Sequence, residues 1–253
     1  MKTILVTGAT SGFGKAIAET FASKGYRIII TGRRTERLEN FKRELEKKFN
    51  TPVLSLCFDV RKLNEVEKNL ENLPADFRKI DVLINNAGLA LGISSIEEGN
   101  TNDWETMIDT NIKGLLYVTR TIAPMMKENK SGHIFNIGSI AGKETYRNGN
   151  VYCATKHAVD SITKATRIDL LPYGIKVTGI CPGAAETEFS LVRYKGDEDR
   201  AKNVYNGFSP LVAEDVAEIV WFAASRPGHV CMNDIVITPT AQANAFYTEK
   251  KTE

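Results

Sequence analysis

The chain has 253 residues, of which 42% are hydrophobic and 25% are charged, and its formal net charge at pH 7 is +2. This length allows one large α/β domain or two small domains, and the near balance of charge argues against nucleic acid or an anionic membrane as a partner. No apolar run approaches the length of a membrane span, and the N-terminal MKTILVTG lacks the cleavage region of a signal peptide. The four cysteines and three histidines are scattered without metal-ligand spacing, so we expect no metal site and a reducing, cytoplasmic setting.

Apolar runs alternate with amphipathic stretches along almost the whole chain. Seven runs predict strands, and most are continuous rather than alternating, as in parallel strands covered on both faces. They span residues 3–7, 27–31, 53–58, 81–85, 133–138, 176–181 and 234–238. The stretches between them predict helices, of which the longest cover about 103–127 and 152–171. This order predicts an α/β fold, a single-domain, Rossmann-type, doubly wound parallel sheet of about seven strands with helices on both faces.

A single domain over residues 1–253 is expected, because the chain has no repeat, low-complexity segment or proline- or serine-rich linker. Residues 184–210 predict an insertion between a strand and a helix. In such folds ligands bind beyond the carboxyl ends of the strands, where a mobile insertion could close over them. From about residue 241 the chain continues as a polar tail, which either reaches a neighbouring subunit or hangs free.

A glycine-rich segment, TGATSGFG, follows the first predicted strand and opens the first predicted helix. Gly8, Gly12 and Gly14 allow a tight turn and a close approach of the backbone to a pyrophosphate at the helix N-terminus. The spacing differs from G-x-G-x-x-G, and a tight turn without a ligand is the alternative. Its place after the first strand favours dinucleotide binding.

The end of the second predicted strand, ITGRR, indicates which dinucleotide binds. Sites for NAD usually carry an acidic residue there to hold the ribose 2′-hydroxyl, but this chain has Gly32, followed by Arg33 and Arg34. A guanidinium can bind a 2′-phosphate through two hydrogen bonds. The alternative is that the arginines are surface charges paired with Glu36 or Glu39. The missing acid favours NADP(H).

A tyrosine and a lysine are spaced for contact on one predicted helix. Tyr152 and Lys156 stand at positions i and i+4, which are neighbours on a helix surface, and a nearby cation favours the phenolate. Tyr247 and Lys251 have the same spacing in the polar tail, so the pair alone is weak evidence for catalysis. The second pair has no partner serine and no preceding glycine loop, and we assign it no function.

Together the segments TGATSGFG (7–14), NNAG (85–88), YCATK (152–156) and PG (182–183) resemble the short-chain dehydrogenase/reductase family from Thr3 to about Thr240. The segments GLALG (88–92), DWETMIDTNIKGL (103–115) and TEFSLVRYKGD (187–197) are similar to a narrower group, the NADP-dependent 3-hydroxy acid dehydrogenases, also described as L-allo-threonine or serine 3-dehydrogenases. The resemblance implies an NADP-dependent oxidoreductase acting on CH–OH groups and a homotetramer.

Four catalytic residues are implied by this resemblance. Tyr152 would act as general acid in reduction and general base in oxidation. Lys156 would lower the tyrosine pKa and hold the nicotinamide ribose. Ser139 would hydrogen-bond the reacting oxygen, and Asn111 would position a water that relays protons to Lys156. Each residue alone has an ordinary structural explanation, but chance poorly explains all four at these spacings.

The resemblance also implies a set of cofactor-binding residues. They are Gly8, Thr10, Ser11, Gly12, Phe13, Gly14, Arg33, Arg34, Asp59, Val60, Asn86, Ala87, Gly88, Tyr152, Lys156, Pro182, Gly183 and Thr187. Asp59 and Val60 would hold the adenine. Ala184 and Ala185 stand where many relatives have a bulkier aliphatic residue, so the resemblance does not define the wall of the substrate pocket.

The implied substrates are small 3-hydroxy acids such as L-allo-threonine, L-serine or 3-hydroxypropionate. Ser139 and Tyr152 would contact the reacting group, and a carboxylate needs a cationic anchor. Arg193 in the insertion and Arg147 are the candidates. Either could instead be a surface residue, paired with an acidic neighbour at Asp197 or Glu144.

Two other functions are open. One is a reductase of other carbonyls, such as 3-oxoacyl thioesters or general ketones, although the charged RYKGDEDR segment argues against a large apolar entrance. The other is a non-catalytic NADP(H)-binding sensor on the same fold. A sensor would not need the proton-transfer residues, and all four of their positions are filled.

Overall fold

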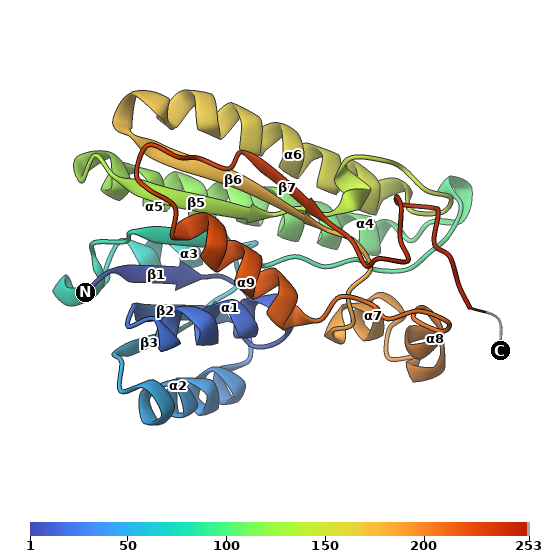
Figure 1. Cartoon of the computed structure of the whole chain (residues 1–253), viewed down its shortest axis with the longest axis horizontal. Helices are drawn as coiled ribbons and strands as arrows, with labels where there is room; N and C mark the ends of the chain where they lie inside the picture. The colour runs from blue at the N-terminus through green and yellow to red at the C-terminus, as the bar shows by residue number, and fades with distance from the viewer. Residues whose placement is uncertain (252–253) are drawn as a thin grey trace.

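Seven parallel strands form one sheet through the centre of the computed structural model, which describes residues 1–251 (Figure 1). The strand order is β3-β2-β1-β4-β5-β6-β7. The strands are β1 (Thr3–Val6), β2 (Arg27–Gly32), β3 (Val53–Cys57), β4 (Val82–Asn85), β5 (Gly132–Ile137), β6 (Ile175–Pro182) and β7 (Asp234–Ile237). The predicted fold class is confirmed, and each predicted strand lies within two residues of an observed one.

Helices cover both faces of the sheet, as predicted. On one face, α1, α2 and α9 bury apolar side chains such as Phe21, Leu38 and Val220. On the other face, α3, α5 and α6 bury residues such as Leu70 and Ile122. The α-helices are α1 (Gly12–Ser23), α2 (Thr35–Phe49), α3 (Leu63–Leu70), α4 (Thr101–Ile108), α5 (Leu115–Glu128), α6 (Asn150–Leu170), α7 (Glu188–Arg193), α8 (Glu198–Asn203) and α9 (Ala213–Ala224).

The central strands β1, β4 and β5 are fully buried, and most of their side chains are apolar. All four residues of β1 and all six residues of β5 are buried. Complete burial of one such Ile, Leu or Phe side chain contributes about 1.5–3 kcal/mol, so β1, β4 and β5 form the rigid centre of the sheet. The carboxyl ends of these strands therefore give a fixed platform for the loops that follow them.

The long amphipathic stretch predicted over 103–127 is divided into three parts. A π-helical segment, Asp109–Gly114, separates α4 from α5. Gly114 packs closely here, because a Cβ on it would lie 2.8 Å from a methyl carbon of Val60. Such π-helical turns are frequent at functional sites, and this one contains Asn111.

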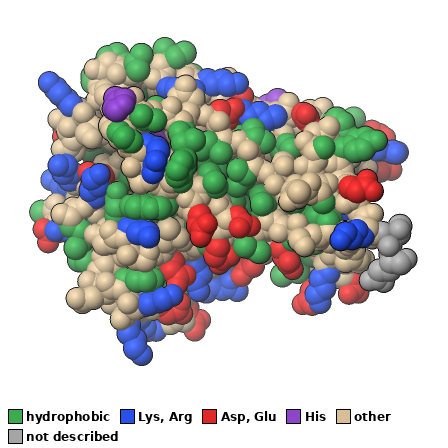
Figure 2. Space-filling view, in the orientation of Figure 1, with side chains coloured by type: hydrophobic (Ala, Val, Ile, Leu, Met, Phe, Trp, Pro, Cys, Tyr) green, Lys and Arg blue, Asp and Glu red, His purple; other side chains and the backbone are tan. Residues whose placement is uncertain are grey.

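One surface of the molecule presents hydrophobic side chains to solvent. They gather on the face where β7 and α9 lie (Figure 2). Phe222 on α9 is 46% exposed, and Val236 on β7 is 50% exposed. As the last strand of the sheet, β7 has no neighbouring strand on its outer side within the described residues. A free strand edge with apolar side chains is suited to contact with another chain.

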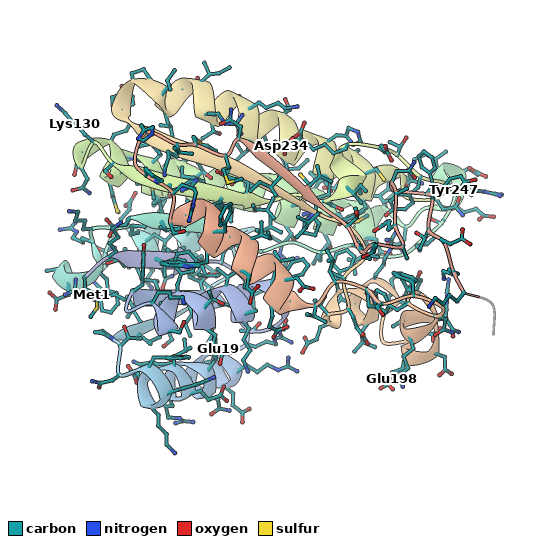
Figure 3. The ribbon with its side chains drawn as sticks, in the orientation of Figure 1. Met1, Glu19, Lys130, Glu198, Asp234 and Tyr247 are labelled. Atoms are coloured by element: carbon teal, nitrogen blue, oxygen red, sulfur yellow. The ribbon has the colours of Figure 1, made fainter. Side chains whose placement is uncertain are left out.

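The insertion and the tail pack against each other. Residues 184–210 carry α7 and α8, and backbone hydrogen bonds join both ends of the insertion, from Glu186 to Leu211 and from Leu211 to Ala184. The tail returns along this segment (Figures 1 and 3), and the Lys251 amide donates to the Gly207 carbonyl at 2.9 Å. Of the two alternatives for the tail, the one in which it hangs free does not hold for residues 241–251.

No helix within residues 1–251 is both long and apolar enough to cross a membrane. The same residues hold no group of three or more His, Cys, Asp or Glu side chains that could bind a metal ion. All four cysteines are free thiols.

A buried histidine in β5 predicts a loss of stability in mild acid. His133 contacts Thr178 Oγ1 through Nε2 at 2.7 Å, and Nδ1 has no partner among the described residues. Burial, helped by the charge of Lys176, lowers the pKa of His133 to about 3, whereas the unfolded chain has a value of about 6.5. The unfolded state therefore binds the proton more readily as pH falls below about 6.5, and it gains free energy relative to the folded state.

Between pH 7.5 and pH 5.5 this difference is expected to lower the free energy of unfolding by about 1.4 kcal/mol. Urea denaturation at the two pH values measures it. His133→Asn should remove most of the pH dependence, while the same change at the exposed His229 should leave it in place. A wild-type protein equally stable at both pH values would contradict the prediction.

Candidate active site

A cleft of about 570 Å³ lies at the carboxyl ends of the strands, as predicted for a doubly wound sheet. Its walls come from the loops that follow β1 to β6, together with the insertion and the tail. Most of the predicted site residues line it: Gly8, Thr10, Ser11, Gly12, Phe13, Arg33, Arg34, Asp59, Val60, Asn86, Ala87, Gly88, Ser139, Tyr152, Lys156, Pro182, Gly183, Thr187 and Arg193. Gly14, Asn111 and Arg147 do not line it.

The glycine loop forms a cradle that larger residues would fill. Gly8 and Gly12 have φ values of +66° and +52°, which side chains rarely adopt. Gly14 lies behind the cleft wall, packed against the loop itself. A Cβ on Gly14 would lie 2.5 Å from the Gly8 carbonyl oxygen. The side-chain Nδ2 of Asn86 donates to the backbone carbonyls of Thr7 and Gly8 at 2.9 and 3.1 Å. The loop is therefore fixed to the end of β4, with the N-terminus of α1 facing the cleft.

At the end of β2 the cleft is positively charged. A Cβ on Gly32 would lie 2.9 Å from the Thr10 methyl, so a larger residue would crowd the glycine loop. Arg34 lies over this loop, and its Nη2 donates to Thr10 Oγ1 at 2.6 Å and to Ser11 Oγ at 3.1 Å. Arg33 lines the cleft and forms no ion pair within residues 1–251.

Neither Glu36 nor Glu39, the partners considered in the alternative interpretation, pairs with these arginines. The carboxylate that meets Arg34 is Glu188, at the start of α7, with Arg34 Nη1 and Glu188 Oε2 3.1 Å apart. The cradle and the free Arg33 fit a dinucleotide that carries an additional phosphate.

Asp59 is held in place after β3 by its neighbour Arg61. The Arg61 Nε donates to both carboxylate oxygens, at 3.0 and 2.9 Å. Burial raises the pKa of Asp59, but the hydrogen bonds and charge of Arg61 outweigh it and keep that pKa below the ordinary value. The carboxylate is thus ionised and rigid at the cleft wall, which is the place predicted for adenine.

The predicted catalytic residues meet at the other end of the cleft. Tyr152 and Lys156 are buried on α6, with exposed fractions of 8% and 7%. Ser139 follows β5 and lines the cleft close to Tyr152. Lys156 Nζ donates to the Ile137 carbonyl at 2.9 Å. The end of β5 is pressed against α6, since a Cβ on Gly142 would lie 2.5 Å from the Lys156 carbonyl oxygen.

Burial dominates the electrostatics of this cluster. It raises the pKa of Tyr152 well above the ordinary value, and the nearby Tyr146 raises it further. The hydroxyl of Ser139 and the charge of Arg193 oppose this shift of the Tyr152 pKa. Burial also lowers the pKa of Lys156 to about 8. Lys156 Nζ lies 6.0 Å from the centre of the Tyr152 ring, so a lowering of the tyrosine pKa by Lys156 stays a prediction.

Asn111 is bonded to the protein rather than exposed in the cleft. Its Oδ1 accepts from the Leu89 amide at 2.9 Å, and its Nδ2 donates to the Leu89 carbonyl and to Thr155 Oγ1. A Cβ on Gly88 would lie 3.3 Å from Asn111 Oδ1 and 3.6 Å from Lys156 Nζ. Asn111 therefore stands beside the cluster, and its predicted role with a water stays a prediction.

Of the two predicted anchors, only Arg193 reaches the cleft. Its guanidinium carbon lies 5.5 Å from the ring centres of both Tyr146 and Tyr152. Its Nε and Nη2 are buried and have no hydrogen-bond partner within residues 1–251. Arg147 is exposed and lies outside the cleft.

The acidic partners considered for these arginines are engaged elsewhere. Asp197 accepts from the Arg200 amide at 3.0 Å and so caps α8. Glu144 accepts from the Ala245 amide in the tail at 3.0 Å. The cationic side chain beside Tyr152 thus has unused donors at the substrate end of the cleft.

Several residues that line the cleft were not identified from the sequence. Tyr146 packs under Arg193, and Phe189 on α7 lies with its ring centre 5.6 Å from that of Tyr152. Gln242 in the tail accepts from the Ala184 amide at 2.7 Å. Tyr146 stands six residues before Tyr152, and this proximity in the sequence is a signal that could have identified it. No feature of the sequence indicates that residues 184 and 242 are in contact.

The family comparison agrees with the resemblance. Residues 2–197 match the model for the short chain dehydrogenase family. The NADP-dependent 3-hydroxy acid dehydrogenase of Salmonella typhi is 47% identical over 243 residues, 96% of each chain. Sulfoacetaldehyde reductase 2 of Chromohalobacter salexigens is 44% identical, over 98% of each chain.

Among solved structures, the closed form of serine dehydrogenase complexed with NADP⁺ has a TM-score of 0.92 and 45% identity, and the match covers 99% of this chain and 100% of that chain. Both the sequence and the fold therefore match relatives over nearly the whole chain. The chain belongs to the short-chain dehydrogenase family.

Proposed function

We propose that this chain is an NADP(H)-dependent oxidoreductase that reversibly oxidises the 3-hydroxyl of small 3-hydroxy acids, such as L-allo-threonine, L-serine or 3-hydroxypropionate. The observation that carries the proposal is one cleft with three features: a glycine cradle beside two arginines, the Ser139–Tyr152 pair near Lys156, and the unpaired guanidinium of Arg193. The relatives named for NADP and 3-hydroxy acids support it.

NADP is the cofactor that the residues at the end of β2 suit. Arg33 and Arg34 offer guanidinium donors for a 2′-phosphate, and Gly32 removes the acid that would repel it. The predicted residues of the glycine loop and of the segments 59–60, 86–88 and 182–187 would hold the rest of the molecule. Bound NADP⁺ supplies the acceptor for the hydride that leaves the substrate, and NADPH supplies the hydride in the reverse direction.

In oxidation, Tyr152 takes the proton of the substrate hydroxyl, and in reduction it returns one. Ser139, which lies close to the tyrosine, donates to the same oxygen and stabilises the charge that develops there. Lys156, with a pKa of about 8, can exchange protons near neutral pH, and Asn111 would hold the water through which it does so. Lys156 would also hold the nicotinamide ribose.

Arg193 gives the preference for acids. Its buried Nε and Nη2 are donors without partners next to Tyr152, and leaving such donors unpaired is costly. A carboxylate that accepts from them would place a hydroxyl two carbons away near the reacting pair. Sulfoacetaldehyde, named for one relative, is also a small anion.

Arg193→Leu is expected to raise KM for 3-hydroxy acids about 10- to 100-fold, because hydrogen bonds to a charged group contribute about 1.5–3 kcal/mol. Turnover of small neutral ketones should change little. Arg147→Leu is the control, because Arg147 lies outside the cleft. Steady-state kinetics with NADP(H) give both constants, and equal losses on acids and neutral ketones would refute the anchor.

Reduction of NADP⁺, followed by absorbance, tests the proposed reaction. The panel is L-allo-threonine, L-serine, their stereoisomers and 3-hydroxypropionate, with NAD⁺ in parallel. Turnover of at least one acid with NADP⁺ is expected. Activity confined to acyl thioesters or large ketones would favour the alternative reductase, and NADPH binding without turnover of any substrate would favour the sensor.

Three further proposals concern the setting of the enzyme. We infer that residues 184–210 act as the substrate loop, supported by α7 and Arg193 at the cleft, in a single domain over 1–253 whose tail helps to close the cleft. The four cysteines are free thiols, which favours a location in the cytoplasm.

The exposed apolar residues on β7 and α9 support a homotetramer, which analytical ultracentrifugation would detect.

A further inference from the structure

Glu188 connects the substrate loop to the cofactor end of the cleft. It is the first residue of α7, and it is separated from Arg34 by 154 positions in the sequence. Its Oε2 lies 3.1 Å from Arg34 Nη1, and its Oε1 lies 2.9 Å from Arg37 Nη1 on α2. One carboxylate therefore bridges two arginines at the wall of the cleft.

The same guanidinium of Arg34 that binds Glu188 lies over the glycine loop. Its Nη2 and Nε donate to the Thr10 hydroxyl, at 2.6 and 3.2 Å, and Nη2 also donates to Ser11. Arg34 therefore has its Nη1 committed to a carboxylate and its other nitrogens to two hydroxyls. A phosphate placed beside Thr10 and Ser11 would have to draw donors away from these partners.

Glu188 carries its negative charge at neutral pH. Burial raises its pKa, but the hydrogen bonds and charges of Arg34 and Arg37 outweigh burial and hold the pKa below the ordinary value. An ionised carboxylate on Arg34 occupies donors that a 2′-phosphate could use and repels the phosphate itself. The Glu188 carboxylate thus binds Arg34 in the way that the 2′-phosphate of the cofactor would bind it.

We propose, on the basis of the proposed use of NADP(H), that Glu188 is a specificity-determining residue that competes with the cofactor's 2′-phosphate for Arg34. Entry of the phosphate transfers Arg34 from Glu188 to the cofactor, and Arg37 keeps the carboxylate. The affinity for NADP(H) is therefore lower than the arginines alone would give, and product cofactor leaves more easily.

The position of Glu188 links this exchange to the substrate loop. Thr187, the residue before it, caps α7 by accepting from the Phe189 amide at 3.2 Å. A Cβ on Gly12 would lie 3.4 Å from the Thr187 Cβ, so this turn packs on the glycine loop. Release of Arg34 by Glu188 removes one of the two ion pairs that hold the first turn of α7 to the α2 side of the cleft.

Calorimetric binding of 2′,5′-ADP and 5′-ADP separates the phosphate from the rest of the cofactor. For Glu188→Gln, the Kd of 2′,5′-ADP is expected to fall about two- to fivefold, because an exposed ion pair contributes about 0.2–1 kcal/mol. The Kd of 5′-ADP should not change. Glu198→Gln is the matched control, since Glu198 lies in the same loop and pairs only with Lys202 among the described residues, on the outer side of α8 (Figure 3).

A double-mutant cycle identifies the partner. In an Arg34→Ala background, where only direct repulsion between the carboxylate and the phosphate remains, Glu188→Gln should lower the Kd of 2′,5′-ADP less than it does with Arg34 present. Weaker or equal binding of 2′,5′-ADP by the single Glu188→Gln variant would overturn the inference, because Glu188 would then support Arg34 or play no part. If the wild-type protein binds 2′,5′-ADP no better than 5′-ADP, the preference for NADP itself fails, which is a different result.

Discussion

Replacing Tyr152 with phenylalanine is expected to lower kcat about 10²- to 10⁴-fold, the usual contribution of a positioned general acid or base. The hydroxyl that is removed is the one close to Ser139 at the substrate end of the cleft. The ring remains, and it keeps its contacts with Phe189 and Arg193. Binding of NADP(H) should therefore change by less than about threefold, and the loss should appear in kcat with both acids and aldehydes.

The chain provides its own control for this substitution. Tyr247 precedes Lys251 at the same spacing, but its side chain is 69% exposed and lies at the outer edge of the molecule (Figure 3). Tyr247→Phe should leave kcat unchanged. Steady-state kinetics with thermal unfolding of both variants make the comparison, and a folded Tyr152→Phe protein that keeps more than a tenth of the wild-type kcat would contradict the assignment.

Replacing Arg34 with alanine is expected to weaken NADP(H) binding about 10- to 100-fold and to leave NAD(H) binding almost unchanged. Two charge-assisted hydrogen bonds to a phosphate, at about 1.5–3 kcal/mol each, are partly offset in the wild type by the bonds of Arg34 to Thr10, Ser11 and Glu188. Arg33 remains to attract the phosphate, so the loss of affinity for NADP(H) should not exceed the upper end of this range.

Fluorescence titration with NADPH and NADH measures the change in preference. Arg43→Ala is the control, because Arg43 lies on α2 and its side chain bonds to Asn40. An equal loss of affinity for both cofactors would mean that Arg34 supports the glycine loop rather than reading the phosphate.

The arrangement of the strands and the glycine loop could be predicted because their causes are local. Continuous runs such as the TILV of β1 can only be buried, and the positive φ values of Gly8 and Gly12 need a residue without a side chain. The place of Tyr152 and Lys156 on one helix also follows from their spacing. For these elements the sequence pattern and the observed structure agree within two residues.

The rest of the site depends on contacts between distant segments, which no spacing reveals. Arg193 and Arg147 look equivalent in the sequence, yet α7 brings only the first to the cleft. The carboxylate on Arg34 comes from Glu188 rather than from a nearby glutamate. The amide of Ala184 is bound by Gln242 of the tail. The π-helical turn at Asn111 ends at Gly114, which packs closely on the distant Val60.

The proposed catalytic cluster also combines a feature that the sequence predicts with one that only the complete fold determines. The spacing places Lys156 near Tyr152, but the depth of burial, which raises the tyrosine pKa and lowers that of the lysine to about 8, comes from the whole fold. The proposed catalysis by Tyr152 would therefore depend on Ser139 and Arg193, which oppose the effect of burial on the tyrosine pKa.

Transfer of deuterium from 3-hydroxypropionate labelled at carbon 3 tests the central claim most directly. The enzyme is incubated with NADP⁺ and the labelled acid, and the NADPH formed is analysed by mass spectrometry. Direct hydride transfer at the 3-carbon predicts one deuterium in each NADPH and none in the Tyr152→Phe sample, which should form almost no NADPH. NADPH without deuterium, or no NADPH from any 3-hydroxy acid, would contradict the proposed reaction.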